Sequence, residues 1–272
     1  MCDRLQDRAR DQLVDSPVLE FLKSLRRTPQ TNELPESAWR AALARLPLLH
    51  GLSADELQRL RERALRFLRD KQITPAGGLE LTDRMRLMIA LQACLPILNL
   101  DPDYYAGWVE VIVYPGQFVP EHEYTDEAGV VHVTRHAMAG EAWLQGPVVL
   151  SWADVAVAGG ADGFNVVIHE LAHKLDMRNG GADGFPPLHP GMNTQAWTRI
   201  FSAAYADFCR RVDRGEDTLL DPYATENPGE FFAVLSEAFF EIPHGLKDSY
   251  PDVYGQLAAF YRQDPAARQA AI

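Results

Sequence analysis

Residues 166–181, VVIHELAHKLDMRNGG, constrain the fold of this chain more than any other segment. His169 and His173 stand four residues apart, and Glu170 directly follows the first of them. On an α-helix, positions i and i+4 lie on one face, so the two imidazoles point the same way. The residues before the pair are apolar, and the Asn-Gly pair after it is typical of a helix end. The segment therefore predicts a buried helix that presents two histidines side by side.

The pattern H-E-x-x-H is typical of metallohydrolases. The two imidazoles are candidate metal ligands, and Glu170 lies roughly 100° away around the helix axis, given about 3.6 residues per turn. From there it can contact water at the metal as a general base without being a ligand. A buried helix with an incidental histidine pair is the alternative interpretation. The apolar run before the motif and the glycines after it favour the metal site.

A catalytic zinc site usually has three protein ligands and one open position, so one more ligand is needed. The metzincin extension of the motif does not occur in this sequence. A carboxylate from a later helix is the other common arrangement, and the apolar spacing within 221–243 predicts a helix there. From spacing alone, Glu230 and Glu237 are equally good candidates. Glu230 also has a simpler explanation, because Asn227 and Glu230 fit a capping box.

Asp176 lies on the same predicted helix face as the two histidines. Its carboxylate can accept a hydrogen bond from a ligand imidazole and so fix the tautomer of the ring. An aspartate exposed to solvent at the helix end explains it equally well. The pattern leaves these two interpretations open.

The rest of the chain indicates an α+β fold with a small mixed sheet. The first hundred residues are mostly helical by pattern, and a strong amphipathic helix over 52–72 begins with a capping box of Ser53 and Glu56. Other helices are expected within residues 1–26, after Ser37 as a cap, after Thr82, and at 164–178, 194–213 and 228–241. Strands are predicted at 108–115, 129–140 and 146–155. We expect a helical region, 1–100, packed on a catalytic region, 101–272, as one compact unit.

Composition narrows the class of protein. The formal net charge is −12, which argues against binding nucleic acid or an anionic membrane. Three widely spaced cysteines favour a reducing compartment over a disulfide framework. Neither a signal peptide nor a stretch long enough to span a bilayer is evident. These features predict a soluble cytoplasmic protein.

The motifs together resemble the Mlc titration factor A family of bacterial zinc peptidases. PVVLSW, VVIHELAHKLDMRNGGADGFP and YATENPGEFFAVLSEAFFE carry the resemblance. It covers most of the chain after about residue 100, and the helical N-terminal part more loosely. In that family, and in the distantly similar catalytic domain of anthrax lethal factor, a tyrosine precedes a zinc-binding glutamate that opens an EFFA helix. The matching positions here are Tyr223 and Glu230.

The resemblance implies a zincin-like fold and one Zn²⁺ per chain, held by His169, His173 and Glu230. Glu237 then becomes a carboxylate that supports a ligand without binding the metal, or a purely structural one. The resemblance also implies a peptidase of the aminopeptidase type, with Glu170 as general base and Tyr223 as donor to the developing oxyanion. Without the resemblance, Tyr223 is better explained as a packed loop tyrosine.

The same resemblance implies two kinds of partner. One is a peptide substrate, for which the strand GPVVLSW is expected to offer an open edge. An ordinary interior strand is the alternative. The other is the glucose-responsive repressor Mlc, whose binding by family members relieves repression of sugar-uptake genes. A non-catalytic protein-binding regulator with a structural zinc site is the competing function.

Overall fold

The computed structural model describes residues 35–117, 122–125, 131–134, 139–144 and 146–269 of the 272-residue chain. These residues belong to one compact unit that begins at Leu34. The helix expected within 1–26 and part of the strand expected at 129–140 lie outside the described residues. Among the described residues, no helix combines the length and apolarity needed to cross a bilayer.

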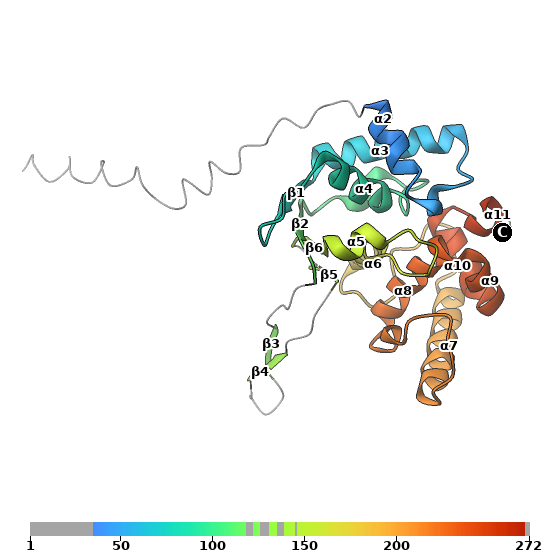
Figure 1. The fold of residues 1–272 in the computed structure, drawn as a ribbon. Helices are drawn as coiled ribbons and strands as arrows, with labels where there is room; N and C mark the ends of the chain where they lie inside the picture. Colours follow the sequence, from blue (N-terminus) through green and yellow to red (C-terminus); the bar gives the residue numbers. More distant parts are fainter. Residues whose placement is uncertain (1–34, 118–121, 126–130, 135–138, 145, 270–272) are drawn as a thin grey trace, which may run out of the picture. The chain divides into compact units, whose positions relative to one another are not determined.

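Helices and the strands of a small sheet follow one another along the described chain (Figure 1). The helices are α2 (Glu36–Leu43), α3 (Ala54–Asp70), α4 (Asp83–Cys94), α5 (Trp152–Val157), α6 (Val166–Asp176), α7 (Thr194–Asp213), α8 (Pro228–Glu241), α9 (Pro243–Ser249), α10 (Pro251–Tyr261) and α11 (Pro265–Arg268). Short 3-10 helices are η1 (Pro47–Leu49), η2 (Pro102–Tyr105), η3 (Met177–Asn179) and η4 (Pro222–Thr225). The strands are β1 (Gln72–Pro75), β2 (Glu110–Tyr114), β3 (His122–Thr125), β4 (Val131–Thr134), β5 (Gly140–Ala142) and β6 (Val148–Ser151). The expected α+β class is confirmed.

The helix start signals were reliable where the cap chemistry was complete. Ser53 Oγ accepts from Glu56 N–H at 3.3 Å, and Glu56 Oε2 accepts from Ser53 N–H at 2.9 Å, so the predicted capping box forms. The prediction of Ser37 as a cap is wrong, because α2 begins at Glu36 and Pro35 occupies the N-cap. The fixed φ of a proline suits the start of a helix, which lets the helix begin before the serine.

Four strands form the sheet next to the histidine helix, in the order β1-β2-β6-β5. β1, β2 and β6 are parallel, and β5 runs antiparallel to β6. The prediction that GPVVLSW offers an open edge is therefore wrong, because β6 pairs with a strand on each side. All four β6 residues are buried, as expected for an apolar strand covered on both faces. Among the described strands, β5 forms the edge on this side.

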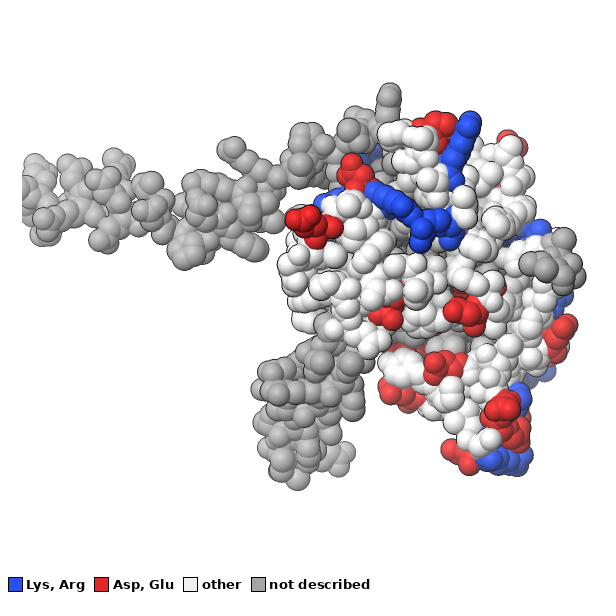
Figure 2. Space-filling view, in the orientation of Figure 1, with Lys and Arg blue, Asp and Glu red and all other residues white. Residues whose placement is uncertain are grey.

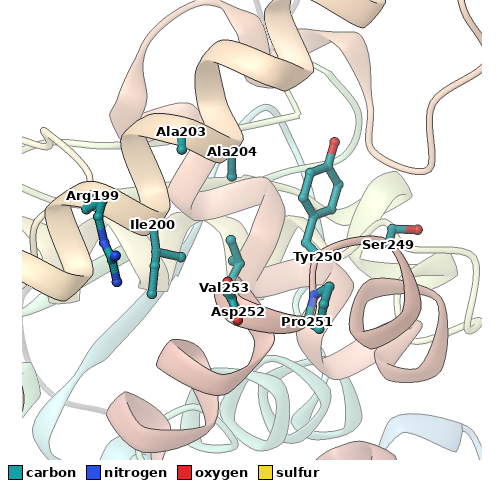
Figure 3. Close-up of a pocket in the computed structure, with 9 residues that line it drawn as sticks. All are labelled: Arg199, Ile200, Ala203, Ala204, Ser249, Tyr250, Pro251, Asp252 and Val253. Atoms are coloured by element: carbon teal, nitrogen blue, oxygen red, sulfur yellow. The ribbon is translucent and has the colours of Figure 1, made fainter.

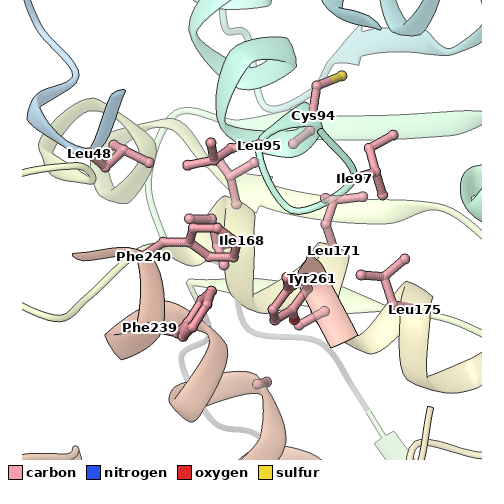
Figure 4. Packing of buried hydrophobic residues seen from close by; sticks show 14 of the residues in the cluster. Leu48, Cys94, Leu95, Ile97, Ile168, Leu171, Leu175, Phe239, Phe240 and Tyr261 are labelled. Carbon is pink, nitrogen blue, oxygen red and sulfur yellow. The ribbon is translucent and has the colours of Figure 1, made fainter. Parts of the chain in front are cut away.

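α6 packs against α8, and its buried stripe fixes its orientation. Ile168, Leu171 and Leu175 repeat at helical spacing and are fully buried. Figure 4 shows them among Phe239 and Phe240 of α8 and residues that end α4. Each such side chain contributes about 1.5–3 kcal/mol on burial. The stripe therefore holds α6 firmly beside α8.

Lys and Arg side chains on the face drawn in Figure 2 gather mainly where α2 and α3 lie in Figure 1. Several arginines of these two helices form ion pairs: Arg40 and Arg61 with Glu36, and Arg66 with Asp70 and Asp103. Partly exposed pairs of this kind contribute little to stability, usually about 0–1 kcal/mol each.

Candidate metal centre

α6 and α8 bring three side chains together at ligand distance. Nε2 of His169 lies 3.0 Å from Oε2 of Glu230, and Nε2 of His173 lies 3.3 Å from the same oxygen. The two Nε2 atoms are 3.2 Å apart. Ligand atoms around a tetrahedral zinc ion with bonds of about 2.0–2.1 Å lie about 3.3–3.4 Å from one another. In the part of the chain that the structure describes, no other group of His, Cys, Asp or Glu converges in this way.

The local sequence of α8 explains how Glu230 reaches the histidines. Asn227 caps the helix, since its Oδ1 accepts from Glu230 N–H at 3.0 Å, and Pro228 occupies the first turn. Only the backbone of Glu230 takes part in the cap. Its carboxylate turns to His169 and His173 instead of completing the capping box. The cap thus forms through the backbone alone, and the carboxylate of Glu230 lies beside the two histidines.

Glu237 lies behind the cluster and not in it. Its Oε1 is 2.8 Å from Nδ1 of His169, the ring nitrogen opposite the one that faces Glu230. A carboxylate in this position favours a proton on Nδ1 and leaves Nε2 as a metal ligand. The structure therefore separates the two glutamates, one beside Nε2 and one behind the ring.

The charges around the cluster favour a cation. Burial lowers the pKa of His169, but Glu237 and Glu230 outweigh it and raise that pKa well above its usual value. Burial opposes ionisation of Glu230, yet hydrogen bonds from His169 and His173 bring its pKa well below the usual range. The negative charge of these carboxylates stabilises a metal cation in the same way as it stabilises a protonated histidine. Two imidazoles with one carboxylate form a donor set typical of zinc. The residues present thus fit a zinc ion.

Glu170 is buried beside the cluster, at 4 % exposure, and burial raises its pKa to about 8. It lies against Gly140 of the edge strand β5. A Cβ at position 140 would stand 2.4 Å from Oε1 of Glu170, so no larger residue fits there without a shift. Gly140 was missed in the sequence. A glycine inside a strand often marks such a close approach, and this was the available signal.

Tyr223 stands on η4, just before α8. Asp221 caps η4 by accepting from Tyr223 N–H at 2.8 Å. The Tyr223 ring centre is 6.2 Å from that of His169, and the residue is 39 % exposed. Burial of the hydroxyl and the nearby carboxylate of Glu230 raise its pKa, so it remains a proton donor at neutral pH. The structure thus places Tyr223 at the exposed side of the histidines.

Asp176 is fully buried, so its interpretation as a solvent-exposed aspartate is wrong. Its Oδ2 accepts from Gly184 N–H at 2.7 Å, which ties the loop after α6 back to the helix. Its Oδ1 and the Nδ1 of His173 are both buried without a hydrogen-bond partner. Burial raises the Asp176 pKa to about 6, while His173 is among the groups that lower it. The two residues therefore interact electrostatically without a direct hydrogen bond.

Lys174, the residue after the second histidine, fastens the end of the edge strand to α6. Its Nζ donates to the carbonyls of Trp143 and Gly146, in the turn between β5 and β6. The side chain is buried, at 4 % exposure. α6 therefore carries the histidines, the buried glutamate and the anchor of the neighbouring strand.

A surface groove of about 380 Å³ lies elsewhere, between α7 and the start of α10 (Figure 3). Its walls include Ile200 and Ala204 of α7 and Tyr250 and Val253 beside them. None of the three clustered side chains lines it. The chemistry of the histidine cluster is therefore separate from this groove.

Comparisons with known proteins cover most of the chain. The family model of the glucose-regulated metallo-peptidase M90 matches residues 22–262. A relative from Pectobacterium atrosepticum named Mlc titration factor A is 43 % identical over 242 residues, covering 88 % of this chain and 90 % of the relative. Relatives with the same name are 44 % identical over 243 residues in Serratia proteamaculans, covering 88 % and 91 %, and 41 % over 243 residues in Escherichia fergusonii, covering 89 % and 90 %. The resemblance inferred from the motifs is confirmed.

Proposed function

The chain belongs to the glucose-regulated metallo-peptidase M90 family, and from this premise we propose that it is a zinc-dependent peptidase of the aminopeptidase type. One observation carries the proposal. The ligand atoms of His169, His173 and Glu230 converge within 3.0–3.3 Å, and Glu170 is buried beside them. A structural zinc site usually fills all four positions with Cys and His, and it would leave Glu170 without a role.

His169, His173 and Glu230 would hold the zinc ion. When bound, zinc supplies a Lewis acid that lowers the pKa of a water molecule and polarises a peptide carbonyl. A cation bound beside Glu170 would favour its ionised form, which burial alone disfavours. The ionised Glu170 takes the proton of the attacking water and later gives it to the leaving amine. Its burial beside Gly140 limits its movement, which keeps the carboxylate at a fixed position for both transfers.

Tyr223 donates its hydroxyl proton as a hydrogen bond to the oxyanion that develops on the substrate. Donors of this kind contribute roughly 3–4 kcal/mol to the stability of a transition state. The Tyr223 hydroxyl keeps its proton at neutral pH, as this role requires. Glu237 orients His169 through Nδ1.

The edge strand β5 is the best candidate for peptide binding. In its ladder with β6, the carbonyl of Ala139 and the N–H of Trp143 face β6. Because backbone groups alternate along a strand, those of Gly140 and Ala142 face the opposite edge. An extended peptide can pair there, next to Glu170.

We place this activity in the cytoplasm. Cys94 and Cys209, the two cysteines among the described residues, are both free thiols. Free thiols are typical of a reducing compartment. The substrate is then a cytoplasmic peptide with a free amino terminus.

A second candidate function is binding of the repressor Mlc, with an effect on glucose phosphotransferase genes. The name of the relatives, Mlc titration factor A, supports it. A non-catalytic regulator with a structural zinc site is the extreme form of this alternative. A pull-down with purified Mlc, using chain with and without bound metal, tests the link. Mlc binding that survives metal removal would show that catalysis is not required for it.

The proposed activity is tested with chromogenic aminoacyl substrates and Glu170→Gln, both proteins being assayed for bound zinc. We expect wild type to cleave and the variant to retain zinc but lose about 10²–10⁴-fold in kcat/KM. Zinc in both proteins with cleavage by neither would contradict an aminopeptidase.

A further inference from the structure

A chain of buried polar groups runs behind His169, away from the substrate side. Nδ1 of His169 lies 2.8 Å from Oε1 of Glu237. The other oxygen of Glu237 accepts from the backbone N–H of Asn165, which precedes α6. Both oxygens of Glu237 are thereby held, one by the ring and one by the residue that starts the helix.

Asn165 uses all its hydrogen-bonding groups in this chain. Its Oδ1 caps α6 by accepting from Ile168 N–H at 3.0 Å. Its Nδ2 donates to Oε1 of Gln92 at 2.8 Å and to Oε1 of Glu241 at 2.7 Å. The position of the N–H that holds Glu237 therefore depends on Gln92 and Glu241.

Glu241 extends the chain to the loop before α6. Its Oε2 accepts from Ala161 N–H at 2.9 Å. Ala161 has a φ of 60°, a left-handed conformation that is unusual for an alanine. Glu241 thus holds both this loop and Asn165.

Burying these polar groups costs free energy, which their hydrogen bonds must offset. Gln92 and Asn165 are 0 % exposed, Glu241 is 2 % exposed and Glu237 is 3 % exposed. Replacing buried charged groups together with their partners by well-packed apolar residues is often neutral or stabilising, so a buried polar chain is weak evidence for a stabilising role. Glu237 and Glu241 lie one turn apart on a helix whose neighbours are otherwise mainly apolar. A polar chain at this place is better explained by the imidazole at its end.

We propose that Asn165 and Glu241 are positioning residues for the metal ligand His169. Glu241 and Gln92 fix Asn165, Asn165 fixes Glu237, and Glu237 sets the direction and tautomer of the imidazole. The proposal rests on the proposed zinc function, since a ligand needs a metal to be positioned for. It adds a supporting layer beyond the direct partner of His169 and links it to the loop that contains Ala161.

Two mild variants of the full-length protein test the role of this chain of buried polar groups. Asn165→Ser keeps the helix cap, because serine is a good N-cap, but removes both Nδ2 donors. Glu241→Gln keeps the shape but can accept only one of the two present hydrogen bonds. Ser236→Ala is the matched control. Ser236 is on α8 and 0 % exposed, and its Oγ hydrogen-bonds the Phe232 carbonyl and the Tyr261 hydroxyl outside the chain.

The measured quantity is zinc affinity, by competition with a chromogenic chelator, alongside Tm. Loss of a supporting partner of a metal ligand costs about 10–100-fold in affinity, and these more distant variants should lose about 3–10-fold. Ser236→Ala should lower Tm but leave zinc affinity unchanged. The double variant should lose no more affinity than the weaker-binding single variant, because the two residues act as one unit.

The possible outcomes distinguish failure of this inference from failure of the proposed zinc function. Wild-type zinc affinity in both variants, with Tm lowered as in Ser236→Ala, would make the chain purely structural and overturn the inference alone. Additive losses in the double variant would also overturn it. A wild-type protein that binds no zinc would instead remove the proposed function, and the inference with it. If Asn165→Ser does not fold, Glu241→Gln decides alone: a loss of about 3–10-fold in zinc affinity supports the inference, and wild-type affinity with a lowered Tm overturns it.

Discussion

The metal frame (His169, His173, Glu230 and Glu237) and the rim (Tyr223, Trp143 and Leu144) lie on neighbouring segments but in opposite environments. Side chains of the frame are 4–16 % exposed, whereas the rim residues are 39–52 % exposed. The hydrogen bonds of the frame join α6 to α8 across the protein core. A ring contact of Tyr223 with His169 links the rim to the frame.

This difference separates two properties that an enzyme must combine. In the frame, the proposed metal ligands take part in the contacts that join α6 to α8, so variants of these residues should alter zinc affinity. In the rim, side chains are exposed, so their variants should alter turnover while zinc affinity and Tm hold. A frame variant that left zinc affinity unchanged, or a rim variant that lowered it, would contradict this comparison.

The largest expected effect comes from removing Glu230, the proposed third ligand. Glu230→Gln should lower zinc affinity on the order of 10³-fold, since a tight zinc site divides its binding free energy among a few ligands. Glu226→Gln, an exposed neighbour outside the cluster, is the matched control and should bind zinc normally. Equal affinity of the two variants, in chelator competition, would remove Glu230 from the site.

The next effect belongs to the rim. Tyr223→Phe should lower kcat by about 10²–10³-fold, the usual cost of one oxyanion donor, while zinc affinity and Tm stay at wild-type values. Steady-state kinetics and chelator competition on the same sample measure both. A drop in zinc affinity would move Tyr223 from the rim into the frame.

Glu241, at the far end of the polar chain, gives the fold a pH dependence. Burial raises its pKa from 4.5 to about 7, so the folded state binds its proton more tightly than the unfolded chain. The resulting stability is complete below pH 4.5 and is lost as pH rises through about 7. The loss amounts to about 3 kcal/mol for a shift of this size. The free energy of unfolding, measured with denaturant across this pH range, should change less with pH in Glu241→Gln than in the wild type. Equal pH dependence in the two proteins would contradict the burial effect.

The smallest effect lies at Gly140, on the edge strand beside Glu170. Gly140→Ala places a Cβ against the Glu170 carboxylate, so β5 or Glu170 must shift. We expect kcat/KM to fall by about 10-fold, because a displaced base transfers its proton less well. Gly181→Ala, with no atom near its Cβ, serves as control. Unchanged kinetics in Gly140→Ala would mean that the edge strand does not confine the base.

Periodic patterns in the sequence predicted the helices of the frame well. The stripe of Ile168, Leu171 and Leu175 is visible in the sequence because its spacing is local. The same holds for the α8 helix and for the capping box of Ser53 and Glu56. Such signals depend on residues within one or two turns, which a sequence displays directly.

Long-range pairing was not predictable in the same way. β1 follows α3 directly and was missed, because four residues carry too little pattern. The interior position of β6 depends on which strands lie beside it. Spacing left Glu230 and Glu237 equal, and only the packing of α8 on α6 places one beside Nε2 and the other behind the ring. Asn165 and Glu241 are 76 positions apart in the chain, so no local motif joins them.

The central claim is that the frame binds one zinc ion. Crystals of the zinc-loaded protein, measured on both sides of the zinc absorption edge, test it most directly. We predict one anomalous peak per chain, bonded to Nε2 of His169, Nε2 of His173 and the carboxylate of Glu230. A peak at other residues, or none at this cluster in a protein that carries zinc, would contradict the account.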